Sequence, residues 1–330
     1  MVAVILNDKP APGFQYGYEL SKDGENRYLA TMRLSLKSSD LWILKGQYPG
    51  IQSGDPVCSD SVGIIVKNGD SQSSTPFKVG QRVLINPGYG WDSDERGPEK
   101  SFDILGLKPY LAEAAALPLA GLTAYRALFT KAKVTRGEHV LITGIGGGVA
   151  LFALQFAVAA GAHVYVTSGS QDKIEDAKKL GAVGGVNYKD DNCIEGLKKF
   201  LDGILLSAII DGAGGPLYSK YPRVLKPGAI IATYGHTATG LVGAQAGINL
   251  PKDYVIENID VVGSTMGSRR AYVIMCRVPR DDQEHKIKPI VSQIFRGPLL
   301  ESAYKAVCHE HKQFGKLVIE IDPSDEPQLK

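Results

Sequence analysis

The residues from Gly144 to Gly148 carry the clearest chemical signal in the sequence, because all but Ile145 are glycine. The β-prone segment 139–143 precedes them, and the apolar segment 149–160, which we expect to be helical, follows. A glycine turn between a strand and a helix directs backbone N–H groups and the positive end of the helix at an anion. The alternative is a loop whose glycines only reverse the chain. The flanking strand and helix favour a nucleotide phosphate site over that alternative.

The spacing within this loop indicates which nucleotide it binds. The string G-x-G-x-x-G is incomplete, because Val149 stands where its third glycine would be. Gly144, Gly147 and Ala150 still supply a tight turn, a close approach to phosphate and a small residue for packing the helix on the strand. An ATP-binding Walker loop ends in Gly-Lys-Ser/Thr, and neither a lysine nor a hydroxyl follows Gly148 here. We therefore predict a dinucleotide site with loop contacts from Gly144, Gly146, Gly147, Gly148 and Val149.

The end of the next predicted strand indicates the form of the dinucleotide. An enzyme that uses NAD places Asp or Glu about twenty residues after the loop, on the ribose 2′-hydroxyl. This chain has Ser168, Gly169 and Ser170 there, with Lys173 close behind. Hydroxyls and a lysine can donate hydrogen bonds to the 2′-phosphate, whereas a carboxylate would repel it. The sequence therefore favours NADPH over NADH. The serines are also suitable N-caps for the helix expected near Lys173, and the two roles are compatible.

The surrounding elements divide into two kinds. From about Leu117, apolar strand candidates alternate with helical segments, which predicts a doubly wound parallel sheet with right-handed crossovers. Before about Asp103, short β segments separated by Gly, Pro, Ser and Asp predict an irregular β-rich lobe. FGKLVIEID, near the end of the chain, reads as another strand, so we expect the two chain ends to build one lobe. The β segments of that lobe are 28–36, 61–69, 81–88 and 314–322.

Composition excludes several function classes. Glycine makes up 38 of 330 residues, about 12% against a usual 7%, without the three-residue period of collagen. The balance of 37 basic and 35 acidic residues leaves a net charge of +2, so nucleic acid is a poor partner. The four cysteines form no C-x-x-C pair, and no leader or membrane-spanning segment is apparent. We expect a reduced, soluble, cytoplasmic protein that acts on a small molecule.

A series of motifs resembles one known family along nearly the whole chain. LPLAGLTAYRALF leads into the glycine loop, and KLGAVGGVNYKD, DGAGG, LKPGAIIATYG and a closing FGKLV follow. This order is similar to the medium-chain dehydrogenase/reductase superfamily, and within it to the zinc-free quinone oxidoreductase-like branch. DLWILKGQYPGI and DVVGSTMGSRR also resemble zinc-type alcohol dehydrogenase-like proteins. The resemblance implies a Rossmann coenzyme domain at 116–281 and a GroES-like catalytic lobe made of 1–115 and 282–330, with substrate in the cleft.

The resemblance also implies contacts for the coenzyme. Thr123, Gly235 and the turn 263–266, including Thr265, would lie near the nicotinamide. Lys173 and Tyr188 would hold the 2′-phosphate beside Ser168. Two alternatives stay open: Thr123 as a hydroxyl at a helix start, and Tyr188 as an aromatic side chain packed on the sheet.

Zinc can be tested against the same resemblance. Zinc enzymes of this superfamily take their catalytic ligands at positions that correspond here to Lys37, Ser59 and Leu119, and none of these is a zinc ligand. The four-cysteine loop of a structural zinc is missing as well. Asp60 is expected to be a local hydrogen-bond acceptor, with a cation site as the alternative. We therefore predict no bound zinc.

Without a metal to polarise a carbonyl, reduction of a conjugated acceptor is the easier reaction, because the charge that arrives with hydride spreads as an enolate. By position in the family, Ser39 and Tyr48 are the candidate hydrogen-bond donors to that enolate, with a surface hydroxyl and a structural tyrosine as the alternatives. We expect an NADPH-dependent reductase of a quinone or an α,β-unsaturated ketone.

Three features leave other functions open. The stretch 106–113 is shorter than in relatives, Lys37 replaces a usual asparagine, and Pro279 interrupts an expected helix. The alternatives are a trans-acting enoyl reductase and an NADPH-binding protein with little turnover. A homodimer is one option for the oligomeric state, and His236 is expected to be a loop residue.

Overall fold

The computed structural model describes 111–238, 252–267, 287–296 and 312–320 as its longest stretches. It also describes 4–7, 17–20, 29–36, 56–57, 60–65, 78–89, 100–104, 302–303 and the single residues 43, 45, 53, 275 and 306. The chain divides into two compact units. One combines 1–90 with 96–119 and 289–330, and the other consists mainly of 120–288.

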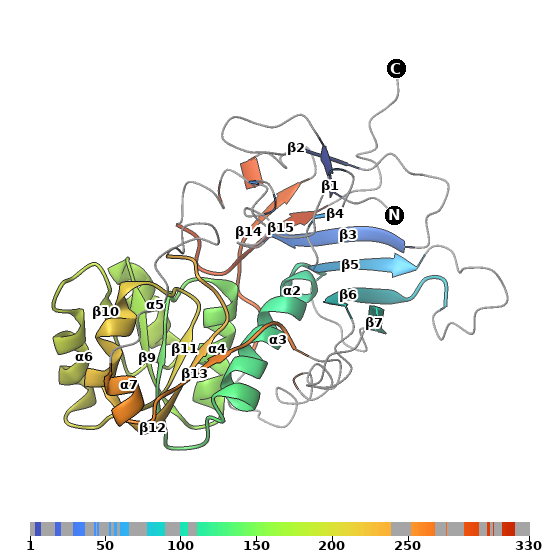
Figure 1. Ribbon diagram of the computed structural model, residues 1–330. Coiled ribbons are helices and arrows are strands. Elements are labelled where there is room, and N and C mark those ends of the chain that lie inside the picture. The colour runs from blue at the N-terminus through green and yellow to red at the C-terminus, as the bar shows by residue number, and fades with distance from the viewer. Residues whose placement is uncertain are drawn as a thin grey trace. The chain divides into compact units, whose positions relative to one another are not determined.

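The second unit is built on a six-stranded parallel sheet, drawn in green to orange in Figure 1. Its strands are β8 (His139–Ile142), β9 (His163–Ser168), β10 (Gly184–Asn187), β11 (Leu206–Asp211), β12 (Leu225–Thr233) and β13 (Asp260–Gly263). They lie in the order β10-β9-β8-β11-β12-β13, and every neighbouring pair is parallel. Counted from β8, this is the order 3-2-1-4-5-6 of a doubly wound dinucleotide-binding sheet.

Helices connect these strands. They are α3 (Pro118–Tyr125), α4 (Gly148–Ala159), α5 (Gln171–Lys179), α6 (Cys193–Leu201) and α7 (Asp253–Ile256), with the π-helix η1 (Arg126–Lys131) and the short 3-10 helices η2 (Pro216–Ser219) and η3 (Tyr221–Arg223). Helix α4 is apolar around most of its circumference and is buried at seven of its twelve positions. A helix that is apolar on all sides needs a covered position. α4 meets this need by packing against β8 and β9.

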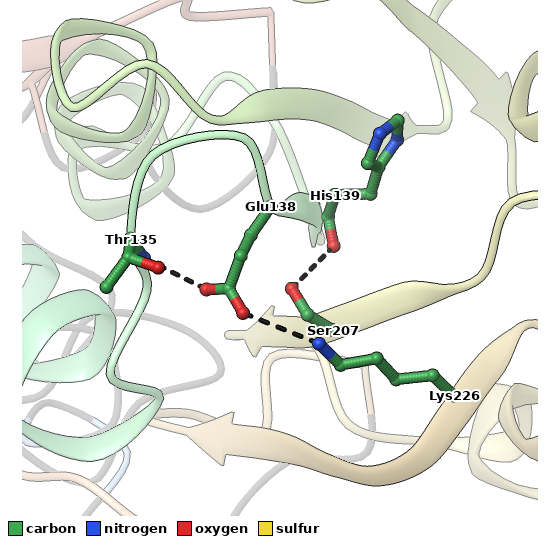
Figure 2. A network of polar contacts seen from close by, with 5 residues as sticks. All are labelled: Thr135, Glu138, His139, Ser207 and Lys226. Atoms are coloured by element: carbon green, nitrogen blue, oxygen red, sulfur yellow. Dashed lines mark hydrogen bonds and ion pairs between the residues drawn. The ribbon is translucent and has the colours of Figure 1, made fainter.

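The amino ends of the parallel strands are tied together by polar side chains (Figure 2). Ser207 Oγ on β11 donates to the carbonyl of His139 on β8 at 3.1 Å. Glu138 Oε2 accepts from the backbone N–H of Thr135 at 2.9 Å, and Lys226 Nζ on β12 lies 3.5 Å from Glu138 Oε1. These contacts fix the spacing of β8, β11 and β12 at the edge opposite their carboxyl ends.

The first unit is β-rich. Its strands are β1 (Val4–Asn7), β2 (Gly17–Leu20), β3 (Leu29–Leu36), β4 (Pro56–Val57), β5 (Asp60–Ile65), β6 (Arg82–Tyr89), β7 (Lys100–Ile104), β14 (Val291–Arg296) and β15 (Lys316–Glu320), and its helix is α2 (Leu111–Ala116). The larger sheet runs β14-β15-β3-β5-β6-β7, and the smaller runs β2-β1-β4. Because β15 pairs antiparallel with β3, the carboxyl-terminal and amino-terminal parts of the chain share one sheet. The predicted α/β fold class, with a β-rich lobe formed by both chain ends, is confirmed.

Most of the predicted elements are observed close to their expected positions. The helix expected at 149–160 runs from Gly148 to Ala159. The helix expected to start near Lys173 begins at Gln171. Strand β10 was not among the strands predicted for the sheet. In the described part of the chain, no helix combines the length and the apolar character needed to cross a membrane.

Candidate functional site

The sheet reverses its order between β8 and β11. From β8 the chain moves outward through β9 to β10, and it then returns to place β11 on the other side of β8. In doubly wound sheets, the connections at such a point leave in opposite directions and open a crevice at the carboxyl ends of the strands, where ligands bind. The predicted glycine loop follows β8 at this point.

The loop has the backbone geometry of an anion site. Gly144 has φ of +66° and Gly146 has φ of +116°, conformations that side chains with a Cβ rarely adopt. Gly147 is the N-cap of α4 and has an extended backbone, with φ of −79° and ψ of 152°. The first backbone N–H groups of α4 have no acceptor within the helix and point out of its amino end. They are available to a phosphate at this end of the helix.

Thr167, the penultimate residue of β9, anchors the start of the loop. Its Oγ1 accepts a hydrogen bond from the Gly144 N–H at 3.2 Å, and its carbonyl accepts one from the Ile145 N–H at 2.8 Å. Only 3% of Thr167 is exposed, so the anchor is shielded from water. The first two amides of the loop are thereby used within the protein, which leaves the later amides for a ligand.

The predicted 2′-phosphate residues cluster at the ends of β9 and β10. Ser168 is buried, its Oγ accepts from the Ser170 N–H at 3.2 Å, and its carbonyl accepts from the Tyr188 N–H at 3.1 Å. A Cβ on Gly169 would lie 2.7 Å from the Tyr188 hydroxyl, so Gly169 leaves room for that phenol. Tyr188 is 47% exposed. It is therefore not the aromatic side chain packed on the sheet that the alternative interpretation expects.

The first turn of α5 adds a lysine to this cluster. Ser170 is the N-cap of α5, although its side chain makes no capping hydrogen bond. Lys173 follows in the first turn, and burial lowers the pKa of its ammonium group. A neighbouring anion would favour the charged form of this side chain and oppose that effect.

Two of the other predicted coenzyme residues, Gly235 and Thr265, follow β12 and β13, and the third, Thr123, lies in α3. A Cβ on Gly235, after β12, would lie 2.9 Å from the carbonyl oxygen of Gly212, so this glycine has a packing reason of its own. Thr265 is exposed in the turn after β13. Thr123 is buried and is the sixth residue of the eight-residue helix α3. The interpretation of Thr123 as a helix-start hydroxyl is therefore wrong.

His236 follows the end of β12. It is exposed and lies in the segment after that strand, as the sequence predicted for a loop residue. Its Nδ1 is 2.8 Å from the position that a Cβ on Gly214 would take, so the loops after β11 and β12 lie against each other.

The predicted catalytic residues Ser39 and Tyr48 lie outside the described residues, as do Lys37, Ser59 and Pro279. Leu119, at the third zinc-ligand position, donates its backbone N–H to Asp60 Oδ1 at 3.0 Å. Asp60 is buried, and its predicted role as a local hydrogen-bond acceptor is confirmed. Among the described residues there is no group of three or more His, Cys, Asp or Glu that could hold a metal ion.

Sequence reasoning missed three polar residues of this edge: Thr143, Thr167 and Asp211. All three are buried, with at most 3% exposed. Each directly follows or closes a run of apolar strand residues, and a polar residue in that place was the available signal.

A parallel sheet in this order, with a glycine loop at its point of reversal, defines a dinucleotide-binding protein. Comparison with known proteins identifies the family. The chain belongs to the medium-chain dehydrogenase/reductase superfamily and is an oxidoreductase of that superfamily, whose members use nicotinamide coenzymes and act on small molecules.

Three similarities stand out. The chain is 35% identical to the zinc-type alcohol dehydrogenase-like protein YogA of Leptosphaeria maculans, over 96% of this chain and 99% of that protein. It is 27% identical to quinone oxidoreductase 1 of Escherichia coli, over 63% of this chain and 64% of that protein. A crystal structure of an NAD-dependent alcohol dehydrogenase superimposes with a TM-score of 0.79 at 26% identity, covering 98% of this chain and 100% of that chain.

Two details of the comparisons concern zinc and chain length. The family described as "Zinc-binding dehydrogenase" matches residues 148–277, which include none of the positions 37, 59 and 119. The match therefore carries no information about zinc ligands. The alignment with the Leptosphaeria protein runs over 365 positions, although it includes only 96% of the 330 residues of this chain. This chain thus lacks residues that its relative has within the aligned region.

Proposed function

We propose that this protein is an NADPH-dependent oxidoreductase that reduces a conjugated carbonyl compound, a quinone or an α,β-unsaturated ketone, without catalytic zinc. The observation that carries the coenzyme part of the proposal is the environment of Gly147. Its φ of −79° suits any residue, and among the described residues a Cβ added there would meet only the carbonyl oxygen of Gly144, at 3.9 Å. No described residue requires a glycine at this position, whereas a phosphate group in contact with the backbone would require one.

The choice of NADPH is supported by what lies after β9. From Ser168 to Gln171 there is no carboxylate to bind a ribose 2′-hydroxyl. The Tyr188 hydroxyl stands over Gly169, and Lys173 supplies a positive charge from the first turn of α5. This donor set fits a phosphate better than a hydroxyl. Because the alcohol dehydrogenase of similar fold is NAD-dependent, NADH is the coenzyme against which NADPH should be tested.

The choice of acceptor is supported by residue types. When bound, NADPH supplies a hydride. Lys37, Ser59 and Leu119 offer no zinc ligand, so no Lewis acid is expected to polarise a simple ketone. A conjugated acceptor needs orientation and one or two hydrogen-bond donors, for which Ser39 and Tyr48 are the proposed residues. The similarity to an E. coli quinone oxidoreductase is in line with this class of acceptor.

An acceptor screen tests the whole proposal. With NADPH, we expect turnover of quinones or free enones, little turnover of saturated ketones, and rates that a zinc chelator leaves unchanged. The measurement is the loss of NADPH absorbance. Tight NADPH binding without turnover of any acceptor would favour the binding protein instead. A strong preference for acyl-thioester enones would favour the enoyl reductase, and inactivation by the chelator would refute the metal-free reaction.

A charge-neutral variant of Lys173 tests the choice of coenzyme. Lys173→Gln is expected to weaken NADPH binding about tenfold, the value of one charge-assisted hydrogen bond, and to leave NADH binding unchanged. Lys179→Gln is the matched control, because Lys179 lies on the same helix and pairs with Asp176 in an exposed position. Fluorescence titration of the wild type and both variants with NADPH and with NADH gives the six dissociation constants. Equal losses for NADPH and NADH would contradict a 2′-phosphate contact.

A further inference from the structure

Asp211 is a buried carboxylate at the point where the sheet reverses its order. It is the last residue of β11 and is 0% exposed. Its Oδ1 accepts from the Thr143 hydroxyl at 2.6 Å and from the Ala213 N–H at 3.2 Å. Its Oδ2 accepts from the Gly214 N–H at 3.0 Å and from the Tyr218 hydroxyl at 2.9 Å. The carboxylate therefore joins the end of β8 to the loop that follows β11.

Both side-chain oxygens of Asp211 must act as hydrogen-bond acceptors for its partners. Two of them are backbone N–H groups, one on each oxygen, and these can only donate. An asparagine in this place would turn its NH₂ group toward one of these N–H groups, whichever way its amide was flipped. Only a carboxylate matches the four hydrogen bonds.

The charge of Asp211 is held by neutral donors in a buried setting. The hydrogen bonds described for it come from hydroxyls and backbone amides. Burial, with the nearby Asp211 charge as a further cause, raises the pKa of the phenols of Tyr218, Tyr221, Tyr234 and Tyr254. An ion buried among neutral groups is costly, and apolar residues of similar volume usually serve stability as well or better. The carboxylate therefore calls for a reason other than stability.

Thr143 connects the carboxylate to the glycine loop. It lies between β8 and Gly144, and its backbone N–H donates to the carbonyl of Ile210 at 3.1 Å. Its Oγ1 donates to Asp211 and accepts from the Gly212 N–H at 3.0 Å. The loop is thus held from two sides, by Thr167 on β9 and by Thr143 with Asp211 on β11.

We propose that Asp211 is a positioning residue that, through the Thr143 hydroxyl, sets the place of the Gly144–Gly148 loop at the amino end of α4. The link to coenzyme affinity rests on the proposed function. Binding groups must be held within about half an ångström of their productive position. A change in the Asp211–Thr143 contact is therefore expected to alter the loop, although neither side chain has to touch the ligand.

The experiment compares two hydroxyls that join the same two strands. Thr143→Val removes the hydrogen bond at the carboxyl ends of β8 and β11, and Ser207→Ala removes the one at their amino ends (Figure 2). Thr143→Val loses two hydrogen bonds of its hydroxyl and Ser207→Ala loses one, so both variants are expected to lose stability, with the larger loss in Thr143→Val. Thr143→Ser keeps the hydroxyl and is the rescue variant. The readouts on the full-length protein are hydrogen exchange of the amides of residues 144–151 without coenzyme, and the dissociation constant for NADPH.

We expect Thr143→Val to speed exchange at Gly144 and Ile145 and to raise the dissociation constant for NADPH about fivefold, with Thr143→Ser and Ser207→Ala close to wild type. Exchange in Thr143→Val that equals wild type would overturn the positioning role, whether or not coenzyme binds. Equal changes in Thr143→Val and Ser207→Ala would overturn it too, because the effect would then be one of general stability. Loop exchange could be faster in Thr143→Val while the wild-type protein binds neither NADPH nor NADH. That result would uphold the positioning role and refute the proposed function.

Discussion

The variant Gly147→Leu is expected to lose NADPH affinity by about 100-fold or more, a change of about 2.7 kcal/mol in binding free energy. Its unfolding temperature is expected to stay within about 2 °C of the wild-type value, as for a surface substitution. The backbone of Gly147, with φ of −79° and ψ of 152°, is one that leucine adopts freely. The residue is exposed, and the nearest atom of the described residues to a new Cβ is the Gly144 oxygen at 3.9 Å. The side chain therefore fits the protein and fills the space in front of α4.

A second glycine of the same loop is the matched control. Gly144 has φ of +66°, and no atom of the part of the chain that the structure describes lies within 4 Å of a Cβ added there. Gly144→Ala is expected to cost about 1 kcal/mol of stability through backbone strain. The two positions should thus respond in different ways, with a loss of binding at Gly147 and a loss of stability at Gly144. Isothermal titration and thermal unfolding measure the two quantities. Tight NADPH binding by Gly147→Leu would remove the main support for a phosphate site at this loop.

The sequence was sufficient to predict the sheet where strands are apolar and glycine follows. His139–Ile142 has three fully buried apolar residues and leads directly into the glycine loop. The sequence therefore predicted both that this segment is a strand and where the strand ends. Parallel strands place their carboxyl ends on one edge. The residues predicted after β8, β9, β10, β12 and β13 therefore share an edge of the sheet once the order of the strands is known.

Strand β10 was missed because of its composition. Its four residues are Gly184, Gly185, Val186 and Asn187, and glycine and asparagine are poor strand formers. Both glycines are explained by tertiary packing. A Cβ on Gly184 would lie 2.6 Å from the Phe200 ring, and one on Gly185 would lie 2.7 Å from Ile174 and from Val166. The close approach of α5 and α6 to this strand requires glycine, and a local pattern does not reveal that requirement.

The contact between Thr143 and Asp211 was also beyond the reach of sequence patterns. The two residues are 68 positions apart in the chain, and only the return of β11 to the side of β8 brings them together. Each was visible as a polar residue at the end of an apolar strand. That the Thr143 hydroxyl has a carboxylate as its partner depends on the order of the strands, which no local spacing encodes.

Removal of the Asp211 carboxylate is expected to have the largest effect on stability. Asp211→Ala leaves the buried donors of Thr143, Gly214 and Tyr218 and the partly buried Ala213 N–H without their acceptor. An unsatisfied buried donor costs about 1–3 kcal/mol, and water that enters the space left by the carboxylate recovers part of the total. We expect a loss of about 4 kcal/mol in the free energy of unfolding, measured by urea denaturation followed by circular dichroism.

The control for this variant is Asp260→Ala, because Asp260 lies exposed at the start of β13 in the same sheet. A surface substitution of this kind is expected to stay within about 0.5 kcal/mol of wild type. The difference between the two variants isolates the buried hydrogen bonds from the general effect of removing a negative charge. If Asp211→Ala proved as stable as Asp260→Ala, the four hydrogen bonds, of which the one from Thr143 joins the end of β8 to β11, would contribute little to stability. The loop after β8 would then be held chiefly by Thr167, to which the Gly144 and Ile145 amides both bond.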